Sequence, residues 1–207
     1  MTVFVVLMTV CGWAQARTDD SVAGLLHRED VQAELKMTPN QIKKWNEIDR
    51  LPKVKTGGTF ESDPIDIADP YVLDKKNEER ELKAWDFLGP SQAVRLMELV
   101  IQRAGIRAIL RTNVQSALAM SDDQIAEVTQ AKSRHHMAVK DLMRKVATTT
   151  SEIGRLDPKR VADVQRAIDK TLEEDLDKVI TQEQRNALAD MGGKKFTFFE
   201  PRYGSGS

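Results

Sequence analysis

The sequence predicts an all-α protein: a helical bundle of antiparallel hairpins, built from two similar halves that follow an N-terminal signal peptide. Three observations lead to this prediction. Of 207 residues, 11 are glycine, 5% are aromatic and 30% are charged, which favours a helix-rich chain over a β-sandwich or barrel. Four short motifs of the kind that begin α-helices recur along the chain. Between them, apolar residues recur at intervals of three and four, the period of an amphipathic helix.

Residues 1–16 have the features of a signal peptide. They contain no charged side chain, include an apolar run at residues 4–10 and end in the small-x-small pattern of residues 14–16, which signal peptidase accepts. The run is too short to cross a hydrocarbon core of about 30 Å. We therefore expect cleavage after Ala16 and a periplasmic or secreted protein. Since Cys11 is the only cysteine, the exported chain would form no disulfide and no thiolate site.

The charge balance and the absence of familiar catalytic motifs exclude several function classes. The 31 Lys and Arg residues nearly equal the 32 Asp and Glu residues, whereas broad binding of nucleic acid needs a basic stripe. The chain has no Gly-x-Ser-x-Gly, no phosphate-binding glycine loop and no spaced carboxylate motif. We expect no enzyme, no cofactor and no nucleic-acid partner.

The helix-starting motifs share one order: an apolar residue, a capping residue, two spacers and a glutamine. They occupy residues 37–41, 88–92, 120–124 and 180–184. In three of them a Thr or Ser stands at the N-cap and a Gln at N3, which is a capping box; the fourth has Gly89 at the cap. The residues expected to begin helices are Thr38, Gln41, Gln92, Ser121, Gln124, Thr181 and Gln184.

A longer repeat lies behind the short motif. Shifting the chain so that Val31 falls on Val114 superposes six identical pairs, the last of which is Ile42 on Ile125. We therefore expect a first helical unit at residues 17–105, with a mobile loop at 51–70, and a second at 106–193. A tail at residues 194–207 follows, whose Gly-Ser end resembles a flexible linker.

The second unit carries the longest helical pattern. A heptad seam typical of a coiled coil is expected between Asp122 and Ile153, and a matching stripe between Val161 and Val179. The short joint at residues 154–158 makes these helices an antiparallel hairpin. The seam positions are Ile125, Val128, Lys132, His135, Val139, Leu142, Val146, Thr149 and Ile153. In the first half, a shorter stripe is expected from Leu82, Trp85 and Leu88 and then from Leu96, Leu99, Val100 and Ile106.

The histidines of the hairpin give no metal site by their spacing. His135 lies on the seam and is expected at a packed interface, whereas the adjacent His136 is expected to face solvent. Because neighbouring residues on a helix point about 100° apart, the two cannot chelate one ion in a simple way. Histidine side chains in general change charge between about pH 5 and 8, which makes a pH-sensing role for His135 a hypothesis. An unchanged oligomeric state over that range would contradict it.

The C-terminal tail is rich in aromatic residues. It contains Phe196, Phe198, Phe199 and Tyr203 among basic neighbours. One interpretation is that these side chains dock on the helices and close the core. The other is an interface strip that binds a partner or faces a membrane.

The repeated motif resembles the LTxxQ motif of Spy/CpxP-type periplasmic proteins. The matching stretches are residues 37–41, 120–124 and 180–184, with 88–92 a weaker fit because Gly89 replaces Thr. The chain departs from the family pattern in its length, its duplication and its Met or Ile where Leu is typical. The resemblance implies a small α-helical chaperone or a modulator of envelope stress or metal resistance, commonly a cradle-shaped dimer.

These observations together predict a non-enzymatic binding protein. We expect an ATP-independent periplasmic chaperone or envelope-stress modulator whose partners are proteins: a client, or a second copy in a homodimer. An alternative is a structural scaffold that oligomerises through the hairpin at residues 122–180. A third interpretation, a metal-responsive protein, depends on His135 and His136 alone.

Overall fold

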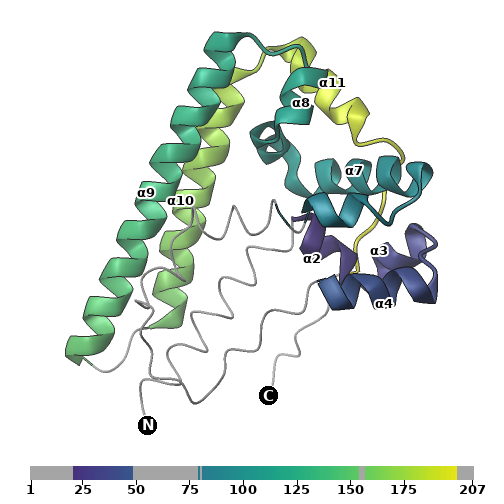
Figure 1. Ribbon diagram of the computed structural model, residues 1–207. Coiled ribbons are helices and arrows are strands. Elements are labelled where there is room, and N and C mark those ends of the chain that lie inside the picture. Colours follow the sequence, from purple (N-terminus) through teal and green to yellow (C-terminus); the bar gives the residue numbers. More distant parts are fainter. Residues whose placement is uncertain (1–20, 49–78, 80, 154–156, 200–207) are drawn as a thin grey trace.

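The computed structural model describes residues 21–48, 79, 81–153 and 157–199, and every regular element within these ranges is helical (Figure 1). The predicted all-α fold is therefore confirmed. The proposed signal peptide and the loop at residues 51–70 lie outside the described residues. Among the described helices none is both long and apolar enough to cross a membrane.

The described helices divide into those before residue 105 and those from residue 105 onward. In the first half, α2 (Val22–Leu26), α3 (Glu29–Glu34) and α4 (Pro39–Ile48) precede a helical turn at residues 81–85 and α7 (Pro90–Ala104). The second half contains the 3-10 helix η2 (Gly105–Leu110), α8 (Thr112–Ala117), α9 (Asp122–Ile153), α10 (Pro158–Val179) and α11 (Gln182–Met191).

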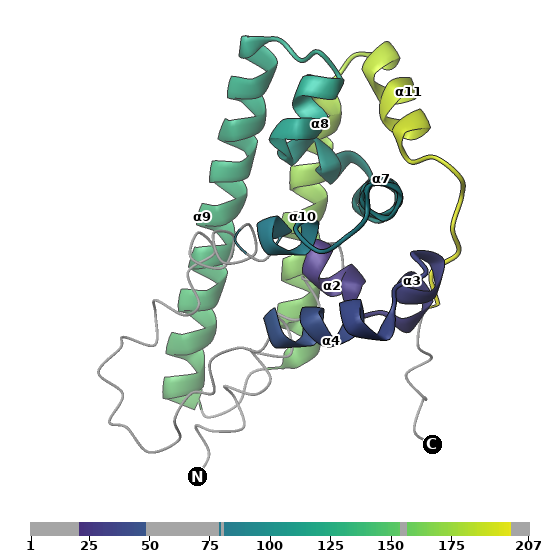
Figure 2. The ribbon, with the colours of Figure 1, turned by 45° about the vertical axis from the view of Figure 1, so that its right-hand side comes forward.

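The long helices α9 and α10 run side by side along one side of the molecule (Figures 1 and 2). Helix α10 begins at Pro158, which suits this first position because proline has no backbone N–H that would need a hydrogen-bond partner. Asp157 caps the helix, since its side chain accepts the Lys159 N–H at 3.0 Å. Their buried seam contains Val128, Val139, Leu142 and Val146 from α9, and Leu172 and Leu176 from α10. Val164 falls within the apolar stripe predicted between Val161 and Val179, but it is 41% exposed.

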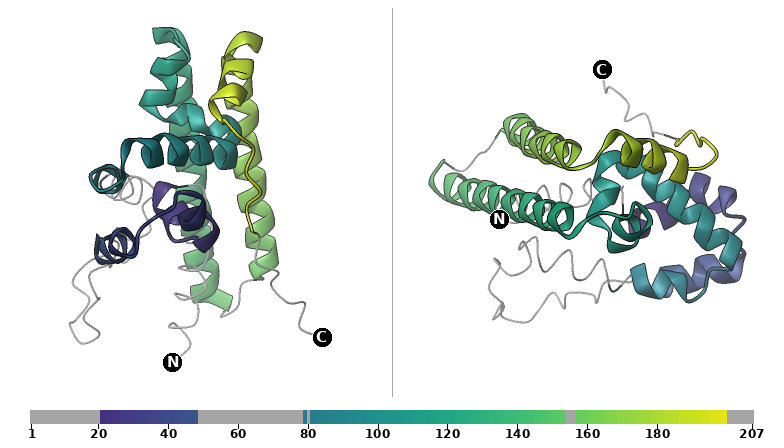
Figure 3. Two further views of the ribbon diagram at one scale, coloured as in Figure 1. Left: turned by 90° about the vertical axis from the view of Figure 1, so that its right-hand side faces the viewer. Right: turned by 90° about the horizontal axis from the view of Figure 1, so that it is seen from above.

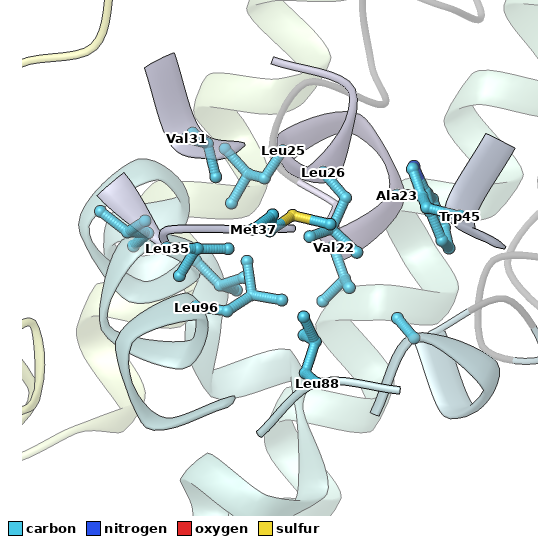
Figure 4. Close-up of a cluster of buried hydrophobic side chains, with 13 residues drawn as sticks. Val22, Ala23, Leu25, Leu26, Val31, Leu35, Met37, Trp45, Leu88 and Leu96 are labelled. Carbon is cyan, nitrogen blue, oxygen red and sulfur yellow. The ribbon is translucent and has the colours of Figure 1, made fainter. Parts of the chain in front are cut away.

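Two clusters of buried side chains form the core. The first joins α2, α3, α4 and α7; it includes the fully buried Trp45, which lies at one edge of the cluster beside Ala23 (Figure 4). The second contains residues of η2, α8 and α11, together with the parts of α9 and α10 that pack against them. Helix α7 contributes Leu96, Leu99 and Val100 to the first cluster and Ile101 to the second, so it links the two. In the left view of Figure 3, α7 runs across the molecule, with α2 to α4 below it and α8 and α11 above it.

His136 is buried, which corrects the prediction that it faces solvent: its exposed fraction is 5%. The prediction assumed that α9 buries a single stripe. However, Ala131, one residue before the seam position Lys132, is also buried, at 2% exposure. Helix α9 therefore buries a wider surface than the seam against α10, and His136 falls within it. A second correction concerns Leu82, which is 68% exposed, while Ala84 takes the buried place beside Leu88.

Candidate functional site

The start of α4 shows how the glutamine motif acts locally. The Gln41 N–H donates to Thr38 Oγ1 at 3.2 Å, and the Thr38 N–H donates to Gln41 Oε1 at 2.9 Å. These reciprocal bonds give partners to two of the N–H groups that a helix leaves unpaired at its beginning. At this helix start the motif therefore forms the capping box that its Thr and Gln residues predict.

The other three motifs also stand at helix starts. Ser121 and Gln124 exchange bonds of 3.0 and 3.2 Å at α9. Thr181 and Gln184 exchange bonds of the same lengths at α11. At α7, Gly89 has no side chain to accept a bond, but its N–H donates to Gln92 Oε1 at 2.9 Å. The glutamine side chain is therefore a capping group at all four helices, even where the hydroxyl is missing.

The glutamines also bind one another across the fold. Gln41 Nε2 donates to Gln92 Oε1 at 2.8 Å, and Gln92 Nε2 lies 3.2 Å from Gln41 Oε1. Each Nε2 donates a second bond to the chain that precedes the other helix: Gln41 to the Phe87 carbonyl at 3.0 Å, and Gln92 to the Leu35 carbonyl at 2.9 Å. We call Gln41 and Gln92, with the N-caps they bind, the first clasp. It joins the starts of α4 and α7.

A second clasp has the same pattern at the starts of α9 and α11. Gln124 Nε2 donates to Gln184 Oε1 at 2.8 Å, and Gln184 Nε2 lies 3.1 Å from Gln124 Oε1. Gln124 also donates to the Val179 carbonyl at 2.8 Å, and Gln184 to the Leu118 carbonyl at 3.2 Å. The two clasps therefore use equivalent backbone carbonyls, two residues before one N-cap and three before the other.

Each clasp gives its amides a full set of partners. A glutamine side chain has two N–H donors and an oxygen with two acceptor sites, and all four are used. The oxygens face the N-cap N–H groups of two helices whose positive dipole ends meet there, so they also offset the repulsion between these ends. This chemistry positions helices; neutral amides supply neither a nucleophile nor a titrating proton.

Other contacts recur at the shift found in the sequence. Gln32 Nε2 donates to the Leu26 carbonyl at 2.7 Å, and at the equivalent place in the second half Gln115 Nε2 donates to the Ile109 carbonyl at 2.8 Å. Both bonds tie the helix before a clasp to the helix that precedes it. The shift is the same as that between Gln41 and Gln124.

The backbone repeats at this shift as well. Lys36 has φ of 50° and Ala119, which the shift superposes on it, has φ of 47°, although neither is glycine. Each lies directly after a short helix and turns the chain toward the following N-cap. A left-handed residue at a helix end is usually glycine, so two non-glycine residues at equivalent places form a specific correspondence.

The histidine pair has a structural place in the hairpin. His135 Nε2 lies 2.9 Å from Asp169 Oδ1 on α10, and Gln165 Nε2 donates to the same oxygen at 2.9 Å. The His135 and His136 rings lie 6.2 Å apart. Among the described residues no group of three His, Cys, Asp or Glu side chains has the arrangement of a metal site.

A polar pocket lies between α9 and α10, and three of its charged side chains form ion pairs. It has a volume of about 290 Å³ and is lined partly by Glu127, Arg134, Asp175 and Lys178. Asp175 accepts from Arg134 at 2.8 Å and lies 3.4 Å from Lys178 Nζ. The hydrogen bond from Arg134 is the main cause that lowers the pKa of Asp175. We assign no ligand to this pocket.

The C-terminal tail contacts the first half of the molecule. Phe196 and Phe198 pack against the first core cluster, whereas Phe199 is 72% exposed. Tyr203 lies outside the described residues. Partial burial acts to raise the pKa of Asp30, but hydrogen bonds from Arg28 and the Phe199 N–H, with the positive charge of Arg28, outweigh it and lower that pKa.

The sequence motifs predicted the helix starts but not the pairing of the glutamines. The sequence did contain a sign of this pairing, because the motif occurs four times and the glutamine is present in every copy. The side chains that bind the tail carried no sequence pattern. Comparison with protein-family models, with curated proteins and with solved structures gives no match to this chain.

Proposed function

We propose that this chain is an exported, non-enzymatic helical binding protein that acts as an ATP-independent chaperone or envelope-stress modulator. The observation that carries the proposal is the pairing of all four glutamine motifs into two clasps. The proposal is supported by the recurrence of the motif at four helix starts, which it joins in two pairs. The family it resembles is that of the Spy/CpxP-type periplasmic proteins.

The surface of the hairpin offers weak, mixed contacts of the kind that hold an unfolded chain. Met137 on α9 is 65% exposed and Val164 on α10 is 41% exposed. Ion pairs lie on the same two helices, such as Arg144 with Asp141 on α9 and Arg166 with Asp163 on α10. Isolated apolar side chains among charges would bind exposed hydrophobic segments without a strong preference for one sequence.

An aggregation assay tests the proposal. The purified chain without residues 1–16 is added to a chemically denatured client protein, and light scattering follows aggregation without ATP. We expect suppression at equimolar to several-fold excess, and less suppression by the Met137→Ser/Val164→Ser variant. Leu82→Ser/Val94→Ser, which alters two similarly exposed apolar residues outside the hairpin, is the matched control. No suppression at several-fold excess would contradict the proposal.

The scaffold alternative is favoured by the same exposed Met137. If the hairpin at residues 122–180 mediates self-association, sedimentation should show a stable assembly that Met137→Ser dissociates. A monomer at all concentrations tested would exclude this alternative.

The metal-responsive alternative would require measurable zinc or copper affinity that His135→Ala and His136→Ala remove.

We also propose that residues 17–105 and 106–193 are two copies of one unit. The bonds and backbone angles that recur at equivalent places in the two halves support this, as do the two clasps. The proposal predicts equal coupling energies between the paired glutamines of both clasps in double-mutant cycles. A coupling in one clasp and none in the other would contradict it.

A further inference from the structure

The tail lies on the first half of the molecule as an extended segment. Residues 194–199 leave α11 through Gly193, whose φ is 61°, and pass α7 to reach α3 (Figures 1 and 2). They form no regular secondary structure. The contacts that hold them are therefore specific side-chain contacts rather than the ladder of a sheet.

One end of the segment is bound by two side chains of α7. The Lys194 carbonyl accepts from Arg95 Nη1 at 2.9 Å and from Gln102 Nε2 at 2.8 Å. Gln102 Oε1 in turn accepts the Phe196 N–H at 2.8 Å. The side chain of Gln102 thus binds the carbonyl of Lys194 and the N–H of Phe196, two residues apart, and so holds this part of the segment extended.

The other end is bound by the start of α3. The Phe199 N–H donates to Asp30 Oδ2 at 2.6 Å, and the Phe199 carbonyl accepts from Arg28. Arg28 and Asp30 also pair with each other at 3.0 Å. The hydrogen bonds from Arg28, Asp30, Arg95 and Gln102 all go to the backbone of the tail, so they do not depend on the identity of its side chains.

Two aromatic side chains supply the sequence-dependent contacts. Phe196 and Phe198 pack edge to face with ring centroids 5.0 Å apart, and both lie against the first core cluster. The guanidinium carbon of Arg28 lies 5.5 Å from the centroid of the Phe198 ring, and that of Arg103 lies 5.4 Å from it. The alternate residues Lys195, Thr197 and Phe199 are exposed, as expected when successive side chains of an extended segment point to opposite sides.

The binding residues are held in place by neighbours other than the tail. Arg95 forms ion pairs with Glu34 at 2.8 Å and with Glu98 at 2.5 Å. The Asp30 carboxylate accepts the Val31 N–H at 3.0 Å at the start of α3. Because these groups have structural partners of their own, the surface is preorganised for a ligand.

We propose that the surface formed by Arg28, Asp30, Arg95, Gln102 and Arg103 is a peptide site for extended polypeptide segments with aromatic residues at alternating positions, and that residues 194–199 are its tethered occupant. Binding through backbone hydrogen bonds, with two anchor positions for specificity, is a common mode of peptide recognition. The inference rests on the proposed function and deepens it, because it names the class of client segment that the site accepts.

Tethering sets how the site responds to a segment from another chain. A short linker gives the tail an effective concentration on the order of mM, so a free segment of equal intrinsic affinity competes only near that concentration. Weakening the two aromatic anchors should open the site without changing the residues that form it. Phe196→Ala/Phe198→Ala makes this change in the full chain, and Phe199→Ala, at an exposed side chain, is the matched control.

Fluorescence anisotropy with a labelled peptide of residues 193–199 tests the proposal. We expect the peptide to bind Phe196→Ala/Phe198→Ala at least about tenfold more tightly than the wild type or Phe199→Ala, because the tethered competitor is weakened. Adding Asp30→Ala and Gln102→Ala to the open variant should weaken binding by about tenfold or more, since the three hydrogen bonds of these side chains to the backbone of residues 194–199 are lost. A peptide with alanine at both anchor positions should not bind.

Hydrogen exchange on the wild-type chain gives a second measurement that needs no variant. An excess of unlabelled peptide at mM concentration should speed exchange at the chain's own Phe196 and Phe199 amides. No binding to the open variant together with unchanged exchange in the wild type would overturn the proposal. A wild-type dimer that the peptide dissociates would also overturn it, since the occupant would then be the tail of a second copy.

The outcome for the peptide site can be separated from that for the chaperone function. If the chain suppresses aggregation but the peptide neither binds nor speeds exchange, the proposed function stands and the peptide site is wrong. If the peptide binds but aggregation is not suppressed, the site stands and the proposed function is wrong.

Discussion

Replacing Gln184 by glutamate separates the two roles of its amide, capping and pairing. Glutamate keeps an oxygen that accepts from the Thr181 N–H and from Gln124 Nε2. It loses the two bonds donated by Nε2, to the Leu118 carbonyl at 3.2 Å and to Gln124 Oε1 at 3.1 Å. An oxygen then faces two oxygens where a donor stood.

The expected magnitude follows from these contacts. Two neutral hydrogen bonds contribute about 0.5–1.5 kcal/mol each, or about 2 kcal/mol together. A carboxylate at a helix N-terminus returns about 0.3–1 kcal/mol. We therefore expect Gln184→Glu to lower the free energy of unfolding by about 1–2 kcal/mol at pH 7. If capping were the only role, glutamate would serve as well as glutamine, and the stability would not fall.

Urea denaturation followed by far-UV circular dichroism measures this difference. Gln182→Glu is the matched control, because Gln182 lies in the first turn of the same helix and donates outward to Asn186 at 3.0 Å. This control should change the free energy of unfolding by no more than about 0.5 kcal/mol. Equal stability of Gln184→Glu and Gln182→Glu would refute the pairing role.

Three further predictions concern the core, the tail and its turn. Trp45→Ala should cost about 3–5 kcal/mol in urea denaturation because Trp45 is fully buried; a loss below about 1 kcal/mol would contradict its place in the core. The pKa of Asp30 is lowered by folding, so its stabilising effect is complete above its ordinary pKa of about 3.9 and is lost as the pH falls through the folded value; an NMR titration midpoint at the ordinary value would contradict this. Gly193→Ala should destabilise the chain more than Gly105→Ala, because both have positive φ but only at Gly193 does a new Cβ lie 2.3 Å from Glu98 Cδ; equal losses in thermal unfolding would show that the contact yields freely.

The helix starts could be predicted because capping is a local effect. Ser121 and Gln124 are three residues apart, and their bonds depend on residue type and spacing alone. The same holds for the end of the hairpin joint, where Asp157 and Pro158 mark the start of α10. Such signals need no knowledge of the rest of the fold.

Contacts between distant residues could not be predicted in this way. The bonds between Gln124 and Gln184 join residues 60 positions apart, and each glutamine looks complete once its own cap is satisfied. The burial of His136 depends on how much of the surface of α9 is covered, which the period of one helix does not specify. The tail is bound by Arg28 and Gln102 through its backbone, so its own side chains do not identify these partners.

Comparison of the four copies of the motif indicates which of its positions tolerates fewer residue types. The capping position holds Thr, Gly, Ser and Thr, so the hydroxyl is dispensable at Gly89, where only one half of the box forms. The glutamine position does not vary. Capping alone would accept glutamate there, and asparagine offers the same amide on a side chain one methylene shorter. Only a side chain with two donors and two acceptor sites, long enough to reach both its own N-cap and the opposite helix start, satisfies all the bonds of a clasp. The glutamines are thus required because each joins the starts of two helices, whereas the Thr and Ser residues only cap the helix that they begin.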